Sequence, residues 1–256
     1  MQTIMFNSEK GGTGKTELST LTAAFMAVIG ARVLVVDLDA QAHATIRFGL
    51  PKAPGLYDVL VRDGDVLDHI VRAEQAAYCP AGKAPAGALY VLPGNFETGM
   101  IANSPIEKDA LADMLDDVSG LIDVCIIDTA PSAGALLAFA HIAADYVVVP
   151  TQLEFLSLDG LIGTIRAAGR SGVELLGIVP NRVKHTALHE MYYEDLQGAA
   201  AENDWHLFGK IYDRIGWAEA SSMQQIIYTF DNEMSKARIE GIRLAREIAV
   251  KVGVYV

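Results

Sequence analysis

Cysteine is scarce in this chain of 256 residues, because only Cys79 and Cys125 occur and neither belongs to a C-x-x-C pair. A metal or cluster site built on cysteine thiolates is therefore not expected. No apolar run approaches the roughly 18 to 20 residues that a membrane-spanning helix needs. The N-terminus also lacks the basic segment and apolar stretch of a signal peptide. We accordingly expect a cytoplasmic protein.

Positive charge is also in short supply, since the formal net charge is −12. Residues 1–160 carry 9 Lys and Arg against 20 Asp and Glu, whereas residues 161–256 carry 11 against 12. Proteins that bind nucleic acids usually present a basic surface that neutralises phosphates. We therefore expect any DNA-binding surface of this chain to lie in its C-terminal third.

Hydrophobic residues are plentiful, at 51% of the chain, which is enough to bury the core of one large domain. Apolar runs at Gln2–Phe6, Ala31–Val36 and Leu121–Ile127 are typical of parallel strands that are buried on both faces. Segments with helical spacing alternate with these runs. We expect one α/β domain over residues 1–256, built on a doubly wound, mostly parallel sheet with helices on both faces.

The remaining elements follow from the same periodicities. Four prolines interrupt Arg47–Gly87, where we expect short helical patches and a surface loop at Tyr78–Gly87. The last helix is expected to place Ile239, Ile242, Ala245, Ile248, Ala249 and Val252 on one side. Further strands are expected at Ala88–Leu92, Tyr146–Val149 and Leu175–Val179, and helices at Gly14–Val28, Leu56–Val61, Val66–Arg72, Lys108–Val118, Ala135–Ala144, Leu158–Ala168, Leu188–Ala201 and Ser235–Val252.

A glycine-rich stretch, Ser8-Glu9-Lys10-Gly11-Gly12-Thr13-Gly14-Lys15-Thr16, follows the first expected strand. Its glycines let backbone N–H groups turn inward around phosphate oxygens, and the next helix points its positive end at the same place. In such a loop the lysine reaches the β- and γ-phosphates and the hydroxyl ligates Mg²⁺. We identify this stretch as a phosphate-binding loop (P-loop), with nucleotide contacts expected from Gly11, Gly12, Thr13, Gly14, Lys15, Thr16 and Glu17.

Carboxylates follow two of the buried strands. Asp37 and Asp39 end the run Ala31–Val36, and Asp128 ends the run Leu121–Ile127. Open α/β sheets bind ligands at the carboxyl ends of their strands, and an aspartate after an apolar strand commonly holds Mg²⁺ through water. A solvated turn would explain Asp37 and Asp39 equally well on their own. The neighbouring P-loop favours a functional role.

These motifs resemble those of the ParA/MinD family of deviant Walker A ATPases, most closely the partition ATPases of the ParA type. The resemblance rests on Lys10, on Asp37-Leu38-Asp39-Ala40-Gln41, where the family usually has proline at position 40, and on Asp128-Thr129-Ala130-Pro131. It implies that Lys10 reaches across a dimer interface to the nucleotide of the other subunit. It further implies that Asp39 orients the attacking water, so that Lys10, Lys15 and Asp39 are catalytic. Thr16, Asp37 and Asp128 would hold Mg²⁺.

The resemblance also assigns the end of the strand Leu175–Val179 to the nucleotide base. Asn181 would read the adenine edge, because an amide can both donate and accept a hydrogen bond. Arg182, which follows it, is also expected to contact the nucleotide. An asparagine in an ordinary turn is the alternative. Glu17 stands where the family usually has Thr or Ser, a departure that leaves the turnover rate open.

The function implied is that of an ATPase that dimerises when it binds ATP and Mg²⁺ and hydrolyses ATP slowly. A ParB-like or other adaptor protein would stimulate it, and the cycle would segregate or position plasmid or chromosomal DNA on the nucleoid. Two basic clusters are candidates for non-specific contacts with DNA, although solvated helix faces would look the same. Their residues are Arg166, Arg170 and Lys184, followed by Lys236, Arg238, Arg243 and Arg246.

Three other functions fit the same fold. A purely regulatory module would hold the nucleotide and barely turn it over, and intact Lys10, Lys15, Asp39 and Asp128 argue against it. A MinD-like membrane positioner needs a basic amphipathic tail, and the final segment Val252–Val256 is short, so a membrane is not an expected partner. A metabolic P-loop enzyme is the third alternative. A nitrogenase-type reductase would need cluster cysteines, and the ATP-dependent ligases of this fold generally lack a lysine at the position of Lys10.

Overall fold

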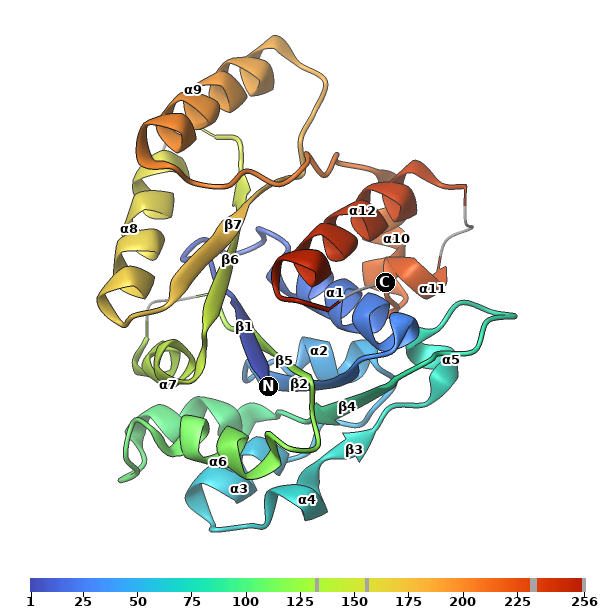
Figure 1. Cartoon of the computed structure of the whole chain (residues 1–256), viewed down its shortest axis with the longest axis vertical. Coiled ribbons are helices and arrows are strands. Elements are labelled where there is room, and N and C mark those ends of the chain that lie inside the picture. Colours follow the sequence, from blue (N-terminus) through green and yellow to red (C-terminus); the bar gives the residue numbers. More distant parts are fainter. Residues whose placement is uncertain (132–133, 155–156, 231–233, 255–256) are drawn as a thin grey trace.

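The computed structural model describes residues 1–131, 134–154, 157–230 and 234–254. The last two residues of the segment considered above as a membrane tail lie outside the described residues. The described strands form one sheet in the order β3-β4-β2-β5-β1-β6-β7 (Figure 1). All neighbours pair in parallel except β3, which runs antiparallel to β4 at one edge. The predicted doubly wound, mostly parallel sheet is thus confirmed. The strands are β1 (Gln2–Phe6), β2 (Arg32–Leu38), β3 (Val71–Arg72), β4 (Ala88–Leu92), β5 (Val124–Thr129), β6 (Tyr146–Gln152) and β7 (Glu174–Asn181).

The central strands are buried on both faces. Along β1, Ile4 and Phe6 point into one apolar core, and Met5 points into the core on the other side of the sheet. Such alternation is what a strand covered by helices on both faces requires. The same alternation places Cys125 in the second core as a buried apolar side chain.

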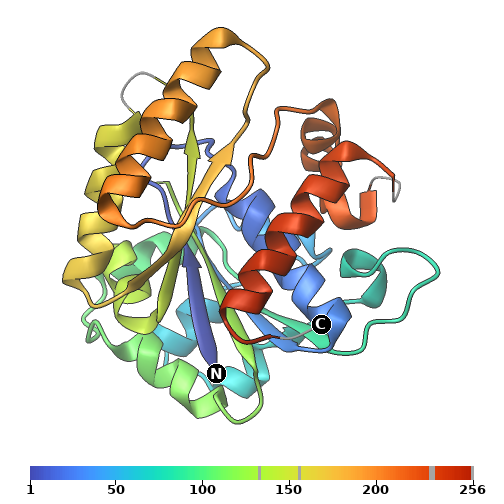
Figure 2. The same ribbon diagram turned by 45° about the horizontal axis from the view of Figure 1, so that its top comes forward.

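Helices cover both faces of the sheet (Figures 1 and 2). The first core packs α1 and α12 against the sheet, and the second packs α3, α6, α7, α8 and α9. None of the described helices combines the length and the hydrophobicity needed to span a membrane. The helices are α1 (Lys15–Ile29), α2 (His43–Arg47), α3 (Gly55–Val61), α4 (Val66–His69), α5 (Gln75–Tyr78), the 3-10 helix η1 (Phe96–Asn103), α6 (Ala110–Val118), α7 (Ala135–Ala143), α8 (Ser157–Arg170), α9 (Ala187–Asn203), α10 (Ile215–Ser222), α11 (Ile227–Phe230) and α12 (Lys236–Lys251).

Several predicted elements need correction. The strand expected from Leu121 begins only at Val124, and the helical patch expected up to Arg72 ends at His69, where β3 follows. The helix η1 was not predicted. This helix starts because the Asn95 side chain accepts a hydrogen bond from the Glu97 N–H, a capping interaction that periodicity does not reveal.

Glycine at position 94 is required by a close backbone contact at the carboxyl end of β2. A Cβ atom there would lie 2.7 Å from the carbonyl oxygen of Asp37 and 3.3 Å from that of Asp39. We expect Gly94→Ala to lower the free energy of unfolding by about 1–3 kcal/mol, because this backbone must shift to make room. Urea denaturation followed by circular dichroism measures the change. Gly120→Ala is the matched control, since a Cβ atom at Gly120 meets nothing within 4 Å. Equal stability of the two variants would contradict the proposed steric conflict.

Candidate functional site

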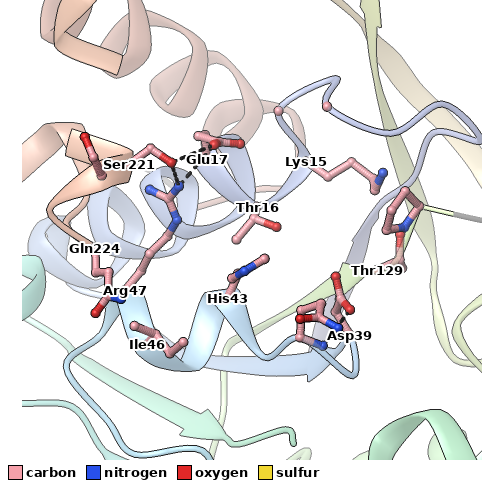
Figure 3. A pocket seen from close by; sticks show the side chains of 15 residues that line it. Lys15, Thr16, Glu17, Asp39, His43, Ile46, Arg47, Thr129, Ser221 and Gln224 are labelled. Carbon is pink, nitrogen blue, oxygen red and sulfur yellow. Dashed lines mark hydrogen bonds and ion pairs between the residues drawn. The ribbon is translucent and has the colours of Figure 1, made fainter. Parts of the chain in front are cut away.

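A cavity of about 470 Å³ opens at the carboxyl ends of the central strands (Figure 3). The P-loop residues Gly12, Gly14, Lys15, Thr16 and Glu17 line one side of it. The remainder of the lining comes from α2, α10, Asp39, Gln41, Thr129, Pro131 and Gln224. Open parallel α/β sheets bind their ligands at this end, at the point where the order in which strands are added to the sheet reverses. The fold therefore gathers the predicted loop and one of the predicted aspartates in a single pocket.

The shape of the P-loop depends on two glycines with positive φ, Gly12 at 75° and Gly14 at 92°. A Cβ atom at Gly14 would lie 2.2 Å from Nδ2 of Asn181. That same amide nitrogen donates a hydrogen bond of 2.7 Å to the carbonyl oxygen of Thr13, and Nε2 of Gln152 donates one of 2.7 Å to the carbonyl oxygen of Gly12. Strands β6 and β7 thus hold the loop in place from outside.

Lys15 lies inside the loop with only 5% of its surface exposed. Its Nζ donates hydrogen bonds to the carbonyl oxygens of Ser8, at 3.1 Å, and of Lys10, at 3.5 Å. Burial lowers the pKa of this amine, while the negative charges of Asp128, Asp39 and Glu17 act in the opposite direction. An ammonium group in this position can bind phosphate oxygens that enter the cavity.

Thr16 and Asp128 form the candidate magnesium site. The Thr16 hydroxyl donates to Asp128 Oδ2 at 2.8 Å, and the Ser19 hydroxyl donates to Oδ1 at 2.9 Å. Burial raises the pKa of the Asp128 carboxyl, and the negative charge of Asp37 raises it further. A nearby cation would favour the ionised form. A hydroxyl and a carboxylate are hard oxygen donors, and Mg²⁺ is usually held by one or two protein groups together with phosphate and water. The residues present therefore fit that ion.

The two aspartates after β2 have different surroundings. Asp39 lines the cavity, and its Oδ1 accepts a hydrogen bond of 2.9 Å from the Gln41 N–H. Asp37 is fully buried, and its Oδ2 accepts hydrogen bonds of 2.7 Å from both the N–H and the hydroxyl of Thr45. Asp37 pairs in register with Asp128, yet the contacts it makes anchor α2. Its role in the magnesium shell remains a prediction.

A second cavity of about 400 Å³ adjoins the first and contains the residues predicted to contact the base. Asn181 and Arg182 line it together with Tyr212 and Trp217. The Asn181 side chain is already engaged, because it donates to Thr13 and its Oδ1 accepts a hydrogen bond of 2.9 Å from the Arg182 N–H. In this structure Asn181 supports the P-loop, and its contact with adenine remains a prediction.

Lys10, the residue at the start of the loop, lies at the surface. Its side chain is half-exposed and forms an ion pair with the half-exposed Glu154. Ion pairs of such exposure contribute little to stability, because water screens the attraction. Lys10 is therefore held only weakly in this position.

The candidate DNA-binding residues do not form one surface on the protomer. Helix α8 carries Arg166 and Arg170, whereas α12 carries Lys236, Arg243 and Arg246 on the other side of the sheet (Figure 2). Lys184 is exposed and lies 4.0 Å from a carboxylate oxygen of Asp213.

Arg238 requires a correction. Its side chain is buried, with 4% exposed, and its guanidinium carbon lies 5.1 Å from the centre of the Tyr228 ring. Burial between α11 and α12 removes Arg238 from any surface that could contact a phosphate.

Sequence reasoning missed Arg47 and Ser221, which line the main cavity. Arg47 forms an ion pair of 3.0 Å with Glu17. The one signal in the sequence is the unusual Glu17 itself, since a carboxylate beside a phosphate site needs a nearby cation. Nothing in the sequence indicates which of the arginines supplies it.

Comparisons with known proteins identify the family. A family model described as "AAA domain" matches residues 1–172. The sporulation initiation inhibitor protein Soj of Bacillus subtilis (strain 168) is 38% identical over 172 residues, which is 64% of each chain, so just under two thirds of that protein is matched. The chromosome-partitioning ATPase Soj of Thermus thermophilus is 33% identical over 186 residues, 69% of this chain and 67% of that protein.

A solved structure gives the same result for the fold. The septum site-determining protein MinD of Pyrococcus horikoshii OT3, complexed with Mg-ADP, has a TM-score of 0.80, at 22% identity over 99% of this chain and 98% of that one. On the evidence of the family model and of the Soj proteins, the chain belongs to the ParA/MinD family of P-loop ATPases, as the motif around Lys10 predicts.

Proposed function

We propose that this protein binds ATP with Mg²⁺, dimerises in that state, and hydrolyses ATP slowly to ADP and phosphate. The cycle serves the segregation or positioning of plasmid or chromosomal DNA, and a ParB-like or other adaptor protein stimulates it. The observation that carries the proposal is the convergence of Lys15, Thr16 and Asp39 on one cavity, with Asp128 bound to Thr16. The similarity to the chromosome-partitioning ATPase Soj of Thermus thermophilus supports the cellular role.

Each residue has a separate task in the proposed reaction. Phosphoryl transfer depends mainly on positioning and on the neutralisation of charge. Lys15 and the N-terminal end of α1 bind the phosphate chain, and Thr16 and Asp128 hold Mg²⁺, which neutralises the phosphate oxygens when it is bound. Asp39 lines the cavity, and its task in the proposed reaction is to orient the attacking water.

Lys10 supports the proposed dimer. It lies at the surface in an ion pair between half-exposed groups. Exchange of Glu154 for a phosphate of the nucleotide bound to a second subunit therefore costs little free energy. The nucleotide then forms part of the interface, and hydrolysis removes the charge that holds the two subunits together.

We expect Lys10→Ala to abolish dimerisation in the presence of ATP and Mg²⁺, because the cation that reaches the second nucleotide is lost. Size-exclusion chromatography with light scattering measures the dimer, and phosphate release measures hydrolysis. Lys251→Ala is the control, since it removes an equal charge from the surface at the far end of α12. If Lys10→Ala dimerises and hydrolyses ATP as the wild type does, the role of Lys10 across the interface is wrong.

We expect Asp39→Ala to form a stable dimer with ATP and to lose hydrolysis by about 100-fold or more, because the water is no longer oriented. The same two assays, performed together, separate assembly from turnover. Asp116→Ala, which removes an exposed carboxylate from α6, should behave as the wild type. Hydrolysis at the wild-type rate in Asp39→Ala would exclude Asp39 from the reaction.

Non-specific DNA binding is the second part of the proposal, and the exposed cations of α12 support it. We expect the ATP-bound protein to retain random duplex DNA in a salt-sensitive manner. We also expect the double variant Arg243→Ala/Arg246→Ala to weaken retention and to lower the slope against salt by about one per lost phosphate contact. Fluorescence anisotropy at several salt concentrations measures both.

Arg32→Ala/Arg62→Ala is the matched control for the DNA experiment, since it removes the same charge from exposed arginines of β2 and the segment after α3. A wild type that shows no salt-sensitive retention of duplex DNA would contradict the proposal.

A further inference from the structure

Glu17 and Arg47 form an ion pair at the edge of the candidate phosphate site. Glu17 lies in the first turn of α1, directly after Thr16, and Arg47 is the last residue of α2. The guanidinium NH2 group lies 3.0 Å from Glu17 Oε1. The side chains are only 8% exposed for Arg47 and 20% for Glu17, so water screens their attraction less than at the surface.

Arg47 is held in position from three sides. Besides Glu17, it donates hydrogen bonds to the Ser221 hydroxyl, at 2.8 Å, and to the carbonyl oxygen of Gln225, at 3.0 Å. Figure 3 shows the consequence: the Glu17 side chain points toward Arg47 and Ser221, on the opposite side of Thr16 from Lys15 and Asp39. The carboxylate is thus kept at the α10 side of the cavity.

The pair lies where the two cavities meet, because Glu17 and Ser221 line both of them. Under the proposed function, the phosphates of a nucleotide contact Lys15 in the main cavity and its base enters the cavity that Asn181 lines. The nucleotide then passes beside Glu17.

Glu17 poses an electrostatic problem for such a ligand. The N-terminal end of a helix attracts anions, and here the phosphate chain and the Glu17 carboxylate compete for it. Two like charges repel strongly in a partly buried site. A neighbouring cation removes most of that repulsion, and Arg47 is the cation bound to this carboxylate.

We propose that Arg47 is a positioning residue for nucleotide binding. It neutralises Glu17 and holds the carboxylate toward α10, so that the phosphate chain can occupy the end of α1. The inference rests on the proposed function. It adds a residue outside the P-loop that sets the nucleotide affinity through its contact with Glu17.

Calorimetric titration with ADP and Mg²⁺ tests the proposal, because ADP avoids hydrolysis. We expect Arg47→Met to bind ADP about 10- to 100-fold more weakly than the wild type at low salt, since the charge of Glu17 is then uncompensated. In Arg47→Met/Glu17→Gln the affinity should return to near that of the wild type.

Two further variants complete the experiment. Arg32→Met is the matched control, because it also breaks an ion pair between an arginine and a carboxylate, here Asp123, and changes the net charge equally, at the opposite end of β2. Glu17→Gln alone keeps Arg47 and should bind ADP more tightly than the wild type, so it decides the matter if Arg47→Met does not fold, as judged by circular dichroism.

The outcomes separate this inference from the proposed function. Wild-type affinity in Arg47→Met, a loss that persists in the double variant, or weaker binding by Glu17→Gln would each overturn the role of Arg47. A loss of ADP affinity that persists in the double variant would show that Arg47 acts only by stabilising the local structure. A wild type that binds no ADP would overturn the proposed function, and this inference with it.

Discussion

The hydrogen bonds from Thr16 and Ser19 to the carboxylate of Asp128 are the contacts on which the site depends. They join the start of α1 to the carboxyl end of β5, and so fix the P-loop between two central elements of the fold. The carboxylate is completely buried, which costs free energy that only good partners offset. A cation at Thr16 would stabilise this arrangement further. The proposed binding of Mg²⁺ therefore strengthens contacts that already exist in the structure.

A balance of charge runs through the rest of the pocket. Carboxylates at Asp37, Asp39 and Asp128 lie close to the place where an anionic nucleotide has to enter, and Lys15 is the cation among them. Without compensating positive charge, these carboxylates would repel phosphate. The P-loop N–H groups and Lys15 supply that compensation on one side, and a bound magnesium ion would add to it. Arg47 does so for Glu17 on the other, which makes the departure at position 17 compatible with nucleotide binding.

Local pattern was sufficient for two of the strands and for the P-loop. The strands β1 and β4 have the predicted bounds, and the P-loop lies where the glycines indicate. The buried face of α12 was harder to predict. Ile239, expected in the core, is 40% exposed, while Arg238 is buried. Ala245, Ile248, Ala249 and Val252 are buried as expected, and Gly241 joins them because it lies against Leu21 and Trp217, where a Cβ atom would be only 2.6 Å from the Leu21 side chain. Periodicity of apolar residues does not show that a glycine or an arginine belongs to the buried side.

Contacts between distant segments could not be predicted either, because periodicity describes only neighbouring residues. Arg47 donates a hydrogen bond to Gln225, which lies 178 positions away along the chain.

For the proposed DNA binding, the charge of a local surface matters more than the net charge of the whole protein. Neutralisation of phosphates depends on the charge at the contact surface, so the net charge of −12 does not exclude it. The cations of α8 and α12 lie on opposite sides of one protomer. A dimer with two-fold symmetry presents each cluster twice, and two copies of one cluster can face the same duplex. The proposed DNA binding therefore requires the proposed dimer, whose assembly in turn requires the nucleotide.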